Sequence, residues 1–321
     1  MNILITSAGQ RVSLVRAFQK ELKAWRSGSQ VFTTDMVPEL SAACNVSDKS
    51  FKVPRVTDPA YIDTLLNICT ANDIKMVVPT IDTELKTLAI NQKVFAEKNI
   101  HVIISSLDFV EKCRDKRLIN IFFEENGIEI PRAIDKSNPV FPLFIKPYDG
   151  SLSVDTFLVE SADKLTTYHL TNERLMFMEY IDKKDHDEYT VDMYYDRNHE
   201  VKCIVPRKRI FVRAGEINKG ITSKNNIVSF LKEKLSVIPG AVGCLTMQVF
   251  LNATTGRIIA IEINPRFGGG YPLSYHAGAN YPAWLIKEYF NNEALSYTDN
   301  WEDKLLMLRY DDEVLVHAHS L

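Results

Sequence analysis

Short apolar runs alternate with amphipathic segments through the first hundred residues. The apolar runs predict strands at residues 3–6, 31–34 and 76–79, and the amphipathic segments predict helices at residues 13–24 and 61–71. The order strand, helix, strand, helix, strand favours a parallel sheet with helices on both faces. Ligands of such open α/β sheets lie outside the carboxyl ends of the strands. We therefore expect the turns that follow the three strands to share one crevice.

Three charged side chains accompany the first and third of these turns. Arg11 follows the first strand, and Asp82 and Glu84 follow the third. Most charged side chains are solvated, so a surface loop position is the simplest interpretation of all three. Contact with a substrate in the shared crevice is the alternative. The first turn holds Gly9 without a G-x-G-x-x-G pattern, which argues against a dinucleotide-dependent dehydrogenase.

A second section of the chain begins near Ser105. Ser105, Ser106 and Asp115 can cap helices over residues 107–113 and 116–125. Further apolar runs, with a polar helix before the last, predict a small α+β unit of about 40 residues, below the size that usually folds alone. These runs span residues 141–147, 156–159 and 175–181. We expect a lid, at about residues 140–180, that moves as an appendage of the larger body.

From residue 188 onward the pattern changes to antiparallel strands. The predicted strands span residues 189–195, 201–205, 244–251 and 257–263. Between them, residues 206–226 are rich in Lys, Arg and Gly. That composition indicates a long functional loop or lid segment rather than core.

Composition and charge narrow the class of protein. The 321 residues are 45% hydrophobic and 25% charged, which is typical of a globular chain of about two domains. Lys+Arg 38 against Asp+Glu 41 gives a net charge of −3, so no basic field attracts nucleic acid. The amino terminus lacks the cationic region of a signal sequence, and no apolar run approaches the roughly 20 residues of a membrane-spanning helix. We expect neither nucleic acid nor membrane as a partner.

The cysteines point to a reducing compartment. All five are scattered along the chain and none forms a C-x-x-C pair, so neither a disulfide framework nor a thiolate zinc site is expected. We expect reduced thiols in a cytoplasmic protein.

The most informative chemistry lies on a predicted hairpin near residues 247–266. If Leu251 pairs with Arg257 across its turn, Gln248 faces Ala260, and Glu262 is the diagonal neighbour of Gln248 about 7 Å away on the same face.

Asn264 shares the face of Glu262 because side chains alternate along a strand. Oxygen-bearing side chains at one end of a hairpin suit Mg²⁺, which is held by a few protein oxygens together with nucleotide phosphates. Arg266, immediately beyond, offers a planar fork for an anion. An exposed strand face, with Arg266 neutralising Glu262, is the alternative.

The motif Glu-Ile-Asn-Pro-Arg at residues 262–266, followed by Phe-Gly-Gly-Gly, resembles the ATP-grasp superfamily. The chain is similar over nearly its whole length to single-module proteins like the large subunit of carbamoyl phosphate synthase and to the pyrrolysine-biosynthesis ligase. The resemblance implies an α/β fold with a Rossmann-like pre-ATP-grasp domain at residues 1–105. A two-lobed α+β ATP-grasp domain would follow at residues 106–321.

The resemblance also implies the roles of individual residues. Glu262 and Asn264 would be metal ligands, Gln248 a further ligand or a phosphate contact, and Arg266 the residue that steadies the transferred phosphate. The matches to the nucleotide-binding motifs are the phosphate lysines Lys116 and Lys146, the adenine hinge Glu179, Tyr180 and Ile181, and the ribose-binding acid Glu188. Lysines and a divalent metal are what a triphosphate requires, because its charge must be neutralised before a nucleophile approaches.

Two segments modify this picture. The phosphate loop, residues 149–156, has Leu152 and Asp155 where the family has glycine, and an acid near polyphosphate is unfavourable. The basic segment after residue 205 is either a solvated loop or a recognition element for acyl phosphate or carboxylate. Arg213 is our first choice there, because it precedes a Gly-Glu pair that resembles the corresponding family loop.

The function that this resemblance implies is an ATP-dependent carboxylate–amine ligase. Mg-ATP, or Mn-ATP, would phosphorylate a carboxylate, and an amine would displace the phosphate. A carbamoyl phosphate synthase-like subunit acting on bicarbonate or carbamate is one alternative, and a non-catalytic nucleotide-binding regulatory protein is another. The expected partners are the small-molecule substrates, and dimers are common in this superfamily, so a homodimer is compatible with the resemblance.

Overall fold

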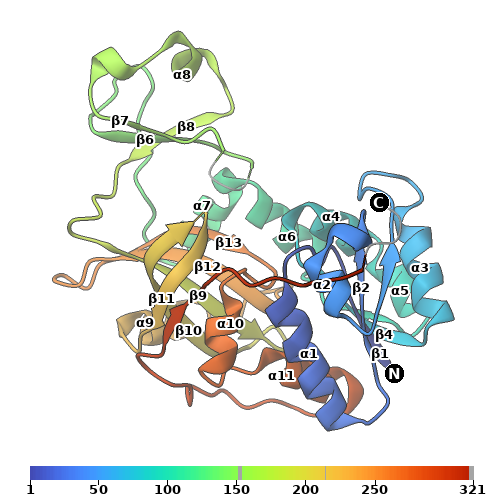
Figure 1. The fold of residues 1–321 in the computed structure, drawn as a ribbon. Helices are drawn as coiled ribbons and strands as arrows, with labels where there is room; N and C mark the ends of the chain where they lie inside the picture. Colours follow the sequence, from blue (N-terminus) through green and yellow to red (C-terminus); the bar gives the residue numbers. More distant parts are fainter. Residues whose placement is uncertain (151–153, 214, 318–321) are drawn as a thin grey trace.

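Three β-sheets organise the chain in the computed structural model, which describes residues 1–150, 154–213 and 215–317. One sheet belongs to an N-terminal domain, one to a lid and one to a large body (Figure 1). The lid stands apart from the other two and joins them through the chain segments before β6 and after β8. None of the helices in the described ranges combines the length and the apolarity needed to cross a membrane.

The N-terminal domain has a parallel sheet in the order β3-β2-β1-β4-β5. Its strands are β1 (Asn2–Ile5), β2 (Val31–Asp35), β3 (Lys49–Lys52), β4 (Ile74–Val78) and β5 (His101–Val102). Its helices are α1 (Val12–Trp25), α2 (Ala42–Val46), α3 (Tyr61–Ala71), α4 (Asp82–Ile90) and α5 (Gln92–Ala96). The predicted parallel sheet is confirmed. The sequence pattern missed β3, β5 and three of the helices, all of which are short.

Two capped helices lead from this domain to the lid. The Ser106 hydroxyl accepts a hydrogen bond from the Phe109 amide at 3.3 Å at the start of α6 (Leu107–Arg114). Asp115 caps α7 (Lys116–Glu125) by accepting from the Arg117 amide at 2.9 Å. These caps satisfy amides that have no partner within the helix, which fixes where each helix begins.

The lid is a small antiparallel sheet in the order β7-β6-β8. Its strands are β6 (Leu143–Pro147), β7 (Phe157–Val159) and β8 (Leu175–Glu179), with the helix α8 (Thr167–Thr171) before the last. Its own small core is formed by Leu143, Ile145, Val159, Leu175 and Phe177. So small a core suits an appendage rather than an independent domain.

The body has an antiparallel sheet in the order β13-β12-β9-β10-β11-β14. Its strands are β9 (Asp187–Tyr195), β10 (Val201–Arg213), β11 (Glu216–Thr222), β12 (Gly243–Leu251), β13 (Ile258–Asn264) and β14 (Leu306–Leu308). Its helices are α9 (Asn226–Lys234), α10 (Tyr271–His276) and α11 (Tyr281–Phe290). Figure 1 shows α10 and α11 lying between this sheet and α1.

The prediction of a long basic loop at residues 206–226 is wrong. Strand β10 continues to Arg213 and pairs with β11 as a hairpin, with Arg213 opposite Glu216. Arg207 is fully buried because Asp192, on the neighbouring strand, neutralises it at 2.8 Å. The cations of this segment suggest a solvated loop if their acidic partners are not considered. The partner of Arg207 is Asp192 on β9, which the local sequence does not reveal.

The N-terminal domain and the body share one hydrophobic core. Ile3 and Phe18 of the first belong to the same cluster as Tyr271 and Tyr281 of the second. The Tyr275 hydroxyl also donates to Glu21 at 2.6 Å across this junction. These contacts hold α1 and the parallel sheet against the body.

Candidate active site

Three polar side chains converge on the β12–β13 hairpin, although not in the predicted register. Leu251 pairs with Ile258 rather than with Arg257, and a bulge after Gln248 places Gln248 directly opposite Glu262. The diagonal relation is therefore wrong. The bulge inserts one unpaired residue and shifts the alternation, which a simple count from the turn cannot foresee.

The corrected register brings the three side chains into contact. The side-chain amides of Gln248 and Asn264 both donate to Oε1 of Glu262, each at 2.9 Å. With both nitrogens turned toward the carboxylate, the two amide oxygens face away from it. No described residue donates to Oε2 of Glu262.

The donor set fits a hard divalent cation. It consists of one carboxylate and two amide groups, and the described residues contain no group of three or more His, Cys, Asp or Glu that could hold a metal by themselves. Mg²⁺ is commonly bound by one or two carboxylates and takes its remaining ligands from water and phosphate. Glu262, Gln248 and Asn264 are therefore suited to Mg²⁺ that arrives with a nucleotide.

Two lysines lie close to this hairpin, at the junction between the lid and the body. Lys146, on β6, is only 6% exposed, and burial lowers its pKa to about 8. The nearby charge of Glu262 opposes that shift, and the charge of Lys116 adds to it. The charges of Lys116 and Glu262 thus both act on the Lys146 ammonium group.

The start of α7 touches the end of β6. The Lys116 amide donates to the Tyr148 carbonyl at 2.7 Å, and its ammonium group donates to the Gly150 carbonyl at 3.1 Å. The Arg117 guanidinium stacks 3.7 Å from the centre of the Tyr148 ring. These contacts connect Lys116 directly to the lid.

The expected phosphate loop is described only in part, because residues 151–153, including Leu152, lie outside the described ranges. Asp155 has a φ of 62°, in the left-handed region that favours glycine. Its carboxylate accepts a hydrogen bond from the Tyr168 hydroxyl at 2.5 Å. Asp155 thus occupies a glycine-like backbone position, and its side chain is engaged within the lid.

The expected adenine hinge leaves the lid at the end of β8. Glu179 pairs with Arg132 through both main chain and side chain, since its amide donates to the Arg132 carbonyl at 2.8 Å and its carboxylate accepts from the Arg132 amide at 3.3 Å. Tyr180 is partly exposed, and Ile181 is buried at 6% exposure. These residues therefore lie on the segment that connects the lid to the body sheet.

Glu188, the expected ribose-binding acid, lies near the start of β9. Its carboxylate pairs with Lys183 at 3.2 Å and with Nε of Arg209 at 3.1 Å. Arg209 is one of the cations that the sequence analysis placed in a loop. Its guanidinium also donates to the Thr190 hydroxyl at 3.1 Å, so it belongs to the face of the body sheet.

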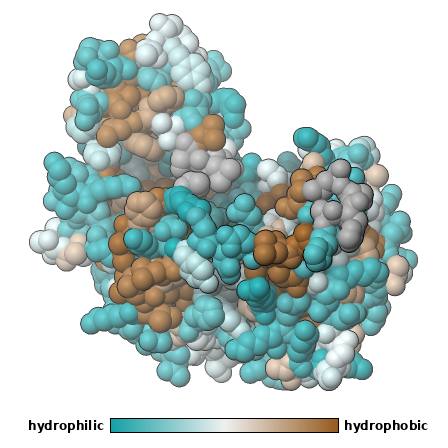
Figure 2. Space-filling view, viewed as in Figure 1, coloured by the Kyte–Doolittle hydropathy of each residue, from teal (hydrophilic) through white to brown (hydrophobic). Residues whose placement is uncertain are grey.

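Two of the turns of the N-terminal domain meet the body at Arg266. Arg266 donates to Asp82 at 2.7 Å, and Arg11 donates to the Thr80 carbonyl at 3.1 Å. Burial lowers the pKa of Arg11, and the charge of Arg266 lowers it further, while Glu216 and Asp82 oppose both effects. The charge of Arg266 thus acts on Arg11, and a planar guanidinium group is suited to an anion. Figure 2 shows the surface hollowed between the lid and the N-terminal domain, with hydrophilic side chains around the hollow.

Glu84 has a structural part in the same turns. It is fully buried, and its carboxylate accepts hydrogen bonds from the amides of Thr80 and Ile81 at 2.7 and 3.1 Å. The hydroxyls of Ser7 and Tyr61 donate to it at 2.9 and 3.0 Å. Burial raises the pKa of Glu84 despite these bonds. Its oxygens are occupied, so Glu84 holds together the turn between β4 and α4.

Glu216, the acid of the Gly-Glu pair after Arg213, and Arg309, which the sequence did not indicate, lie beside the glycine-rich loop. A side chain at Gly269 would overlap the Glu216 carboxylate, and Arg309 pairs with Glu216 at 3.1 Å. Arg213, by contrast, pairs at 2.7 Å with Asp311, and both side chains are largely exposed. Among the described contacts, Arg213 touches none of the other candidate residues.

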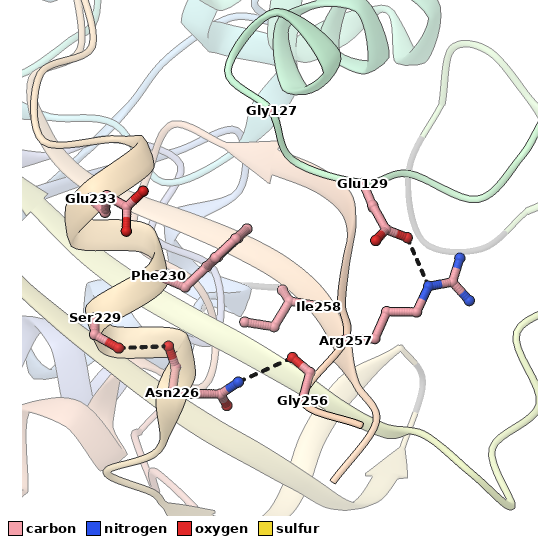
Figure 3. A pocket seen from close by; sticks show the side chains of 9 residues that line it. All are labelled: Gly127, Glu129, Asn226, Ser229, Phe230, Glu233, Gly256, Arg257 and Ile258. Carbon is pink, nitrogen blue, oxygen red and sulfur yellow. Dashed lines mark hydrogen bonds and ion pairs between the residues drawn. The ribbon is translucent and has the colours of Figure 1, made fainter. Parts of the chain in front are cut away.

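A hollow elsewhere on the body is distinct from these residues. Its volume is about 410 Å³, and it lies between α9 and the start of β13 (Figure 3). Its polar groups pair with one another, as Glu129 does with Arg257 at 2.7 Å and Asn226 with the Gly256 carbonyl at 3.1 Å. None of the candidate nucleotide or metal residues lines it.

Two family models match separate parts of the chain. Residues 3–103 match the family of PylC-like N-terminal domains. Residues 171–310 match the family described as ATP-grasp in the biosynthetic pathway with Ter operon. No curated protein sequence matches the chain.

Solved structures share the fold at low sequence identity. The biotin carboxylase domain of Hydrogenobacter thermophilus 2-oxoglutarate carboxylase, in complex with MgADP, ADP and bicarbonate, has a TM-score of 0.73 and 13% identity over 95% of this chain and 73% of that one. N5-carboxyaminoimidazole synthetase from Staphylococcus aureus, in complex with ADP, has a TM-score of 0.70 and 15% identity over 92% of this chain and 78% of that one. These likenesses establish the architecture.

Proposed function

Because the chain belongs to the ATP-grasp superfamily, with a PylC-like N-terminal domain, we propose that it is an ADP-forming carboxylate–amine ligase. The observation that carries the proposal is the convergence of Gln248 and Asn264 on the Glu262 carboxylate, whose charge also acts on the buried Lys146 ammonium group. The contacts among Gln248, Glu262 and Asn264 follow from the register of β12 and β13.

The nucleotide is bound by groups that the fold brings together from the lid and the body. Lys116 and Lys146 donate N–H groups to the phosphates, and the segment from Glu179 to Ile181 lines the adenine. Glu188 accepts from the ribose hydroxyls. Glu262, with Gln248 and Asn264, would hold Mg²⁺ or Mn²⁺, which supplies charge neutralisation at the phosphates.

The chemistry is positioning and neutralisation without a covalent enzyme intermediate. A carboxylate oxygen of the substrate attacks the γ-phosphorus as its bond to the ADP oxygen breaks. An amine then attacks the carbonyl carbon of the acyl phosphate, inorganic phosphate leaves, and the nitrogen loses a proton. Arg266 donates hydrogen bonds to the transferred phosphoryl group. Arg11 and Asp82 line the crevice in which the carboxylate substrate lies.

Bicarbonate is a second candidate substrate. The guanidinium groups of Arg11 and Arg266 suit a small planar anion, and the similar biotin carboxylase domain was crystallised with bicarbonate. Bicarbonate is therefore the first acid to test, before larger carboxylates.

Thermal unfolding with ATP and Mg²⁺, followed by an assay of ADP release, tests the proposal. A ligand at a hundredfold excess over its dissociation constant stabilises a protein by about 2.7 kcal/mol, so binding gives a clear shift in Tm. We expect a magnesium-dependent shift and ADP release that increases with bicarbonate or with a member of a carboxylate and amine panel. A shift without any ADP release would favour a regulatory nucleotide-binding protein, and no shift would refute the nucleotide site.

A further inference from the structure

A fully buried ion pair lies beneath the glycine-rich loop that follows Arg266. Asp192, on β9, is 0% exposed and Arg207, on β10, is 1% exposed by side chain. The pair is bidentate, with Nε donating at 2.8 Å and Nη2 at 2.9 Å to the two carboxylate oxygens. This geometry holds both side chains in one fixed orientation.

Asp192 is contacted by side chains from three further elements, α10, α11 and β12. Ser274, at α10, donates to its carboxylate at 2.6 Å, and Tyr281, at α11, donates to its main-chain carbonyl at 3.0 Å. The Thr246 hydroxyl, on β12, lies 3.4 Å from the same carboxylate and donates to the Arg266 carbonyl at 3.0 Å. Thr246 is therefore the link between the buried ion pair and the backbone of Arg266.

The glycines of the loop rest directly on this network. A side chain at Gly270 would overlap Nη1 of Arg207, and one at Gly268 would approach the Thr246 side chain to 3.0 Å. Nη1 of Arg207 has no hydrogen-bond partner among the described residues. The guanidinium thus serves as a packed surface for the loop in addition to neutralising Asp192.

A buried ion pair is weak evidence for stability, because the loss of hydration offsets the attraction between the charges. Such a pair can instead fix the positions of the groups around it. Here these groups include the Arg266 backbone, which is connected to the pair through Thr246. We propose that Asp192, Arg207 and Thr246 form a positioning network. It sets the Arg266 backbone and the loop of residues 267–270 so that the Arg266 guanidinium lies correctly for phosphoryl transfer. The proposal rests on the function proposed above, and none of the three residues is placed in contact with substrate.

The sharpest test removes only the hydroxyl of Thr246. Thr246→Val keeps the size and branching of the side chain, and Thr246→Ser keeps the hydroxyl, so serine should rescue what valine loses. Thr70→Val is the matched control, because Thr70 is exposed on α3 and its hydroxyl also donates to a main-chain carbonyl, that of Leu66 at 2.8 Å.

In ADP release from Mg-ATP, with bicarbonate as the first acid, we expect Thr246→Val to lower kcat about tenfold or more. This is a modest loss compared with those known for ångström-scale misplacement. The KM for ATP should change less than about twofold, because the lysines and the metal ligands are untouched. Serine should restore kcat to within about threefold. An unchanged kcat in the valine variant, or a serine variant as slow as valine, would overturn the proposal.

Hydrogen–deuterium exchange gives a readout that does not depend on turnover. In Thr246→Val, amides of residues 267–270 should exchange at least about tenfold faster, while Thr70→Val should leave them unchanged. Equal exchange in wild type and Thr246→Val would refute the positioning network even if the protein proves to be a ligase. Absence of any ATP-induced shift in the wild-type protein would instead refute the proposed function, so the two failures are distinguishable.

Discussion

The buried Lys146 ammonium group should make ATP binding weaken steeply at alkaline pH. Burial lowers the pKa of Lys146 to about 8, since the folded protein removes water from a side chain that is 6% exposed. Bound phosphate would favour the protonated form. Mg-ATP should therefore bind the protonated state of the protein and lose affinity as that state is depleted.

The magnitude follows from the fraction of Lys146 that is protonated. With a pKa of about 8, roughly three-quarters of the free protein carries the charge at pH 7.5 and about one-tenth at pH 9. The dissociation constant of Mg-ATP should then rise about eightfold between these values, or about 1.2 kcal/mol. Free lysine titrates near 10.4, so a solvated lysine would give almost no change over this interval.

The lowered pKa of Lys146 also affects the stability of the free protein. Stability should rise with pH, whereas affinity for ATP should fall. Between pH 8 and 10.5 the unfolded chain holds a proton on this lysine that the folded chain has released. Stability rises with pH wherever the unfolded state binds more protons. The contribution of Lys146 to the free energy of unfolding should therefore increase across that window, by up to about 3 kcal/mol.

Calorimetric titration of Mg-ATP from pH 7.5 to 9.5 measures the effect, with Lys146→Arg as the control. Arginine stays protonated throughout, so its dissociation constant should be nearly flat with pH. Lys146→Ala should bind more weakly at every pH and should also be flat. A wild-type curve parallel to that of Lys146→Arg would show that Lys146 does not contact the phosphates in its protonated form.

Three further substitutions test other parts of the site. Glu262→Ala should abolish magnesium-dependent ADP release with little change in the circular dichroism spectrum, and unchanged activity would remove Glu262 from the metal site. Glu84→Ala should lower the free energy of unfolding in urea by about 3 kcal/mol or more, because four donors lose a buried acceptor; a loss below about 1 kcal/mol would contradict the structural part given to Glu84. Asp155→Gly should leave Tm within about 2 °C, since relief of the positive φ offsets the lost bond to Tyr168; an increase in ATP affinity would show instead that the acid faces phosphate.

Local patterns in the sequence determined most of the secondary structure. Helix α3 spans residues 61–71 as its amphipathic pattern predicts, and α7 begins where Asp115 can cap it. Periodicity and capping depend on residues a few positions apart in the sequence. A single segment therefore contains the information that locates its helix. The Glu-Ile-Asn-Pro-Arg motif likewise indicated the ATP-grasp architecture, because its residues are contiguous.

Contacts between distant segments could not be determined in this way. Asp192 buries Arg207 from a neighbouring strand, and Asp82 meets Arg266 from a different domain, 184 residues earlier. The segment containing Arg207 looked like a loop because its charges were counted without their partners. A charged side chain can be buried only where the folded protein places an opposite charge beside it. For Arg207 that placement depends on the pairing of strands in the assembled sheet.

The β12–β13 hairpin, which carries the proposed metal ligands, illustrates both the local and the tertiary contributions. The sequence by itself determined that Gln248, Glu262 and Asn264 share one end of a hairpin, because alternation along each strand is local. Only the tertiary structure decided that Gln248 lies directly opposite Glu262, through a bulge after Gln248. The register of two strands is chosen by how the whole sheet packs against its helices, and no count of residues within the hairpin contains that choice.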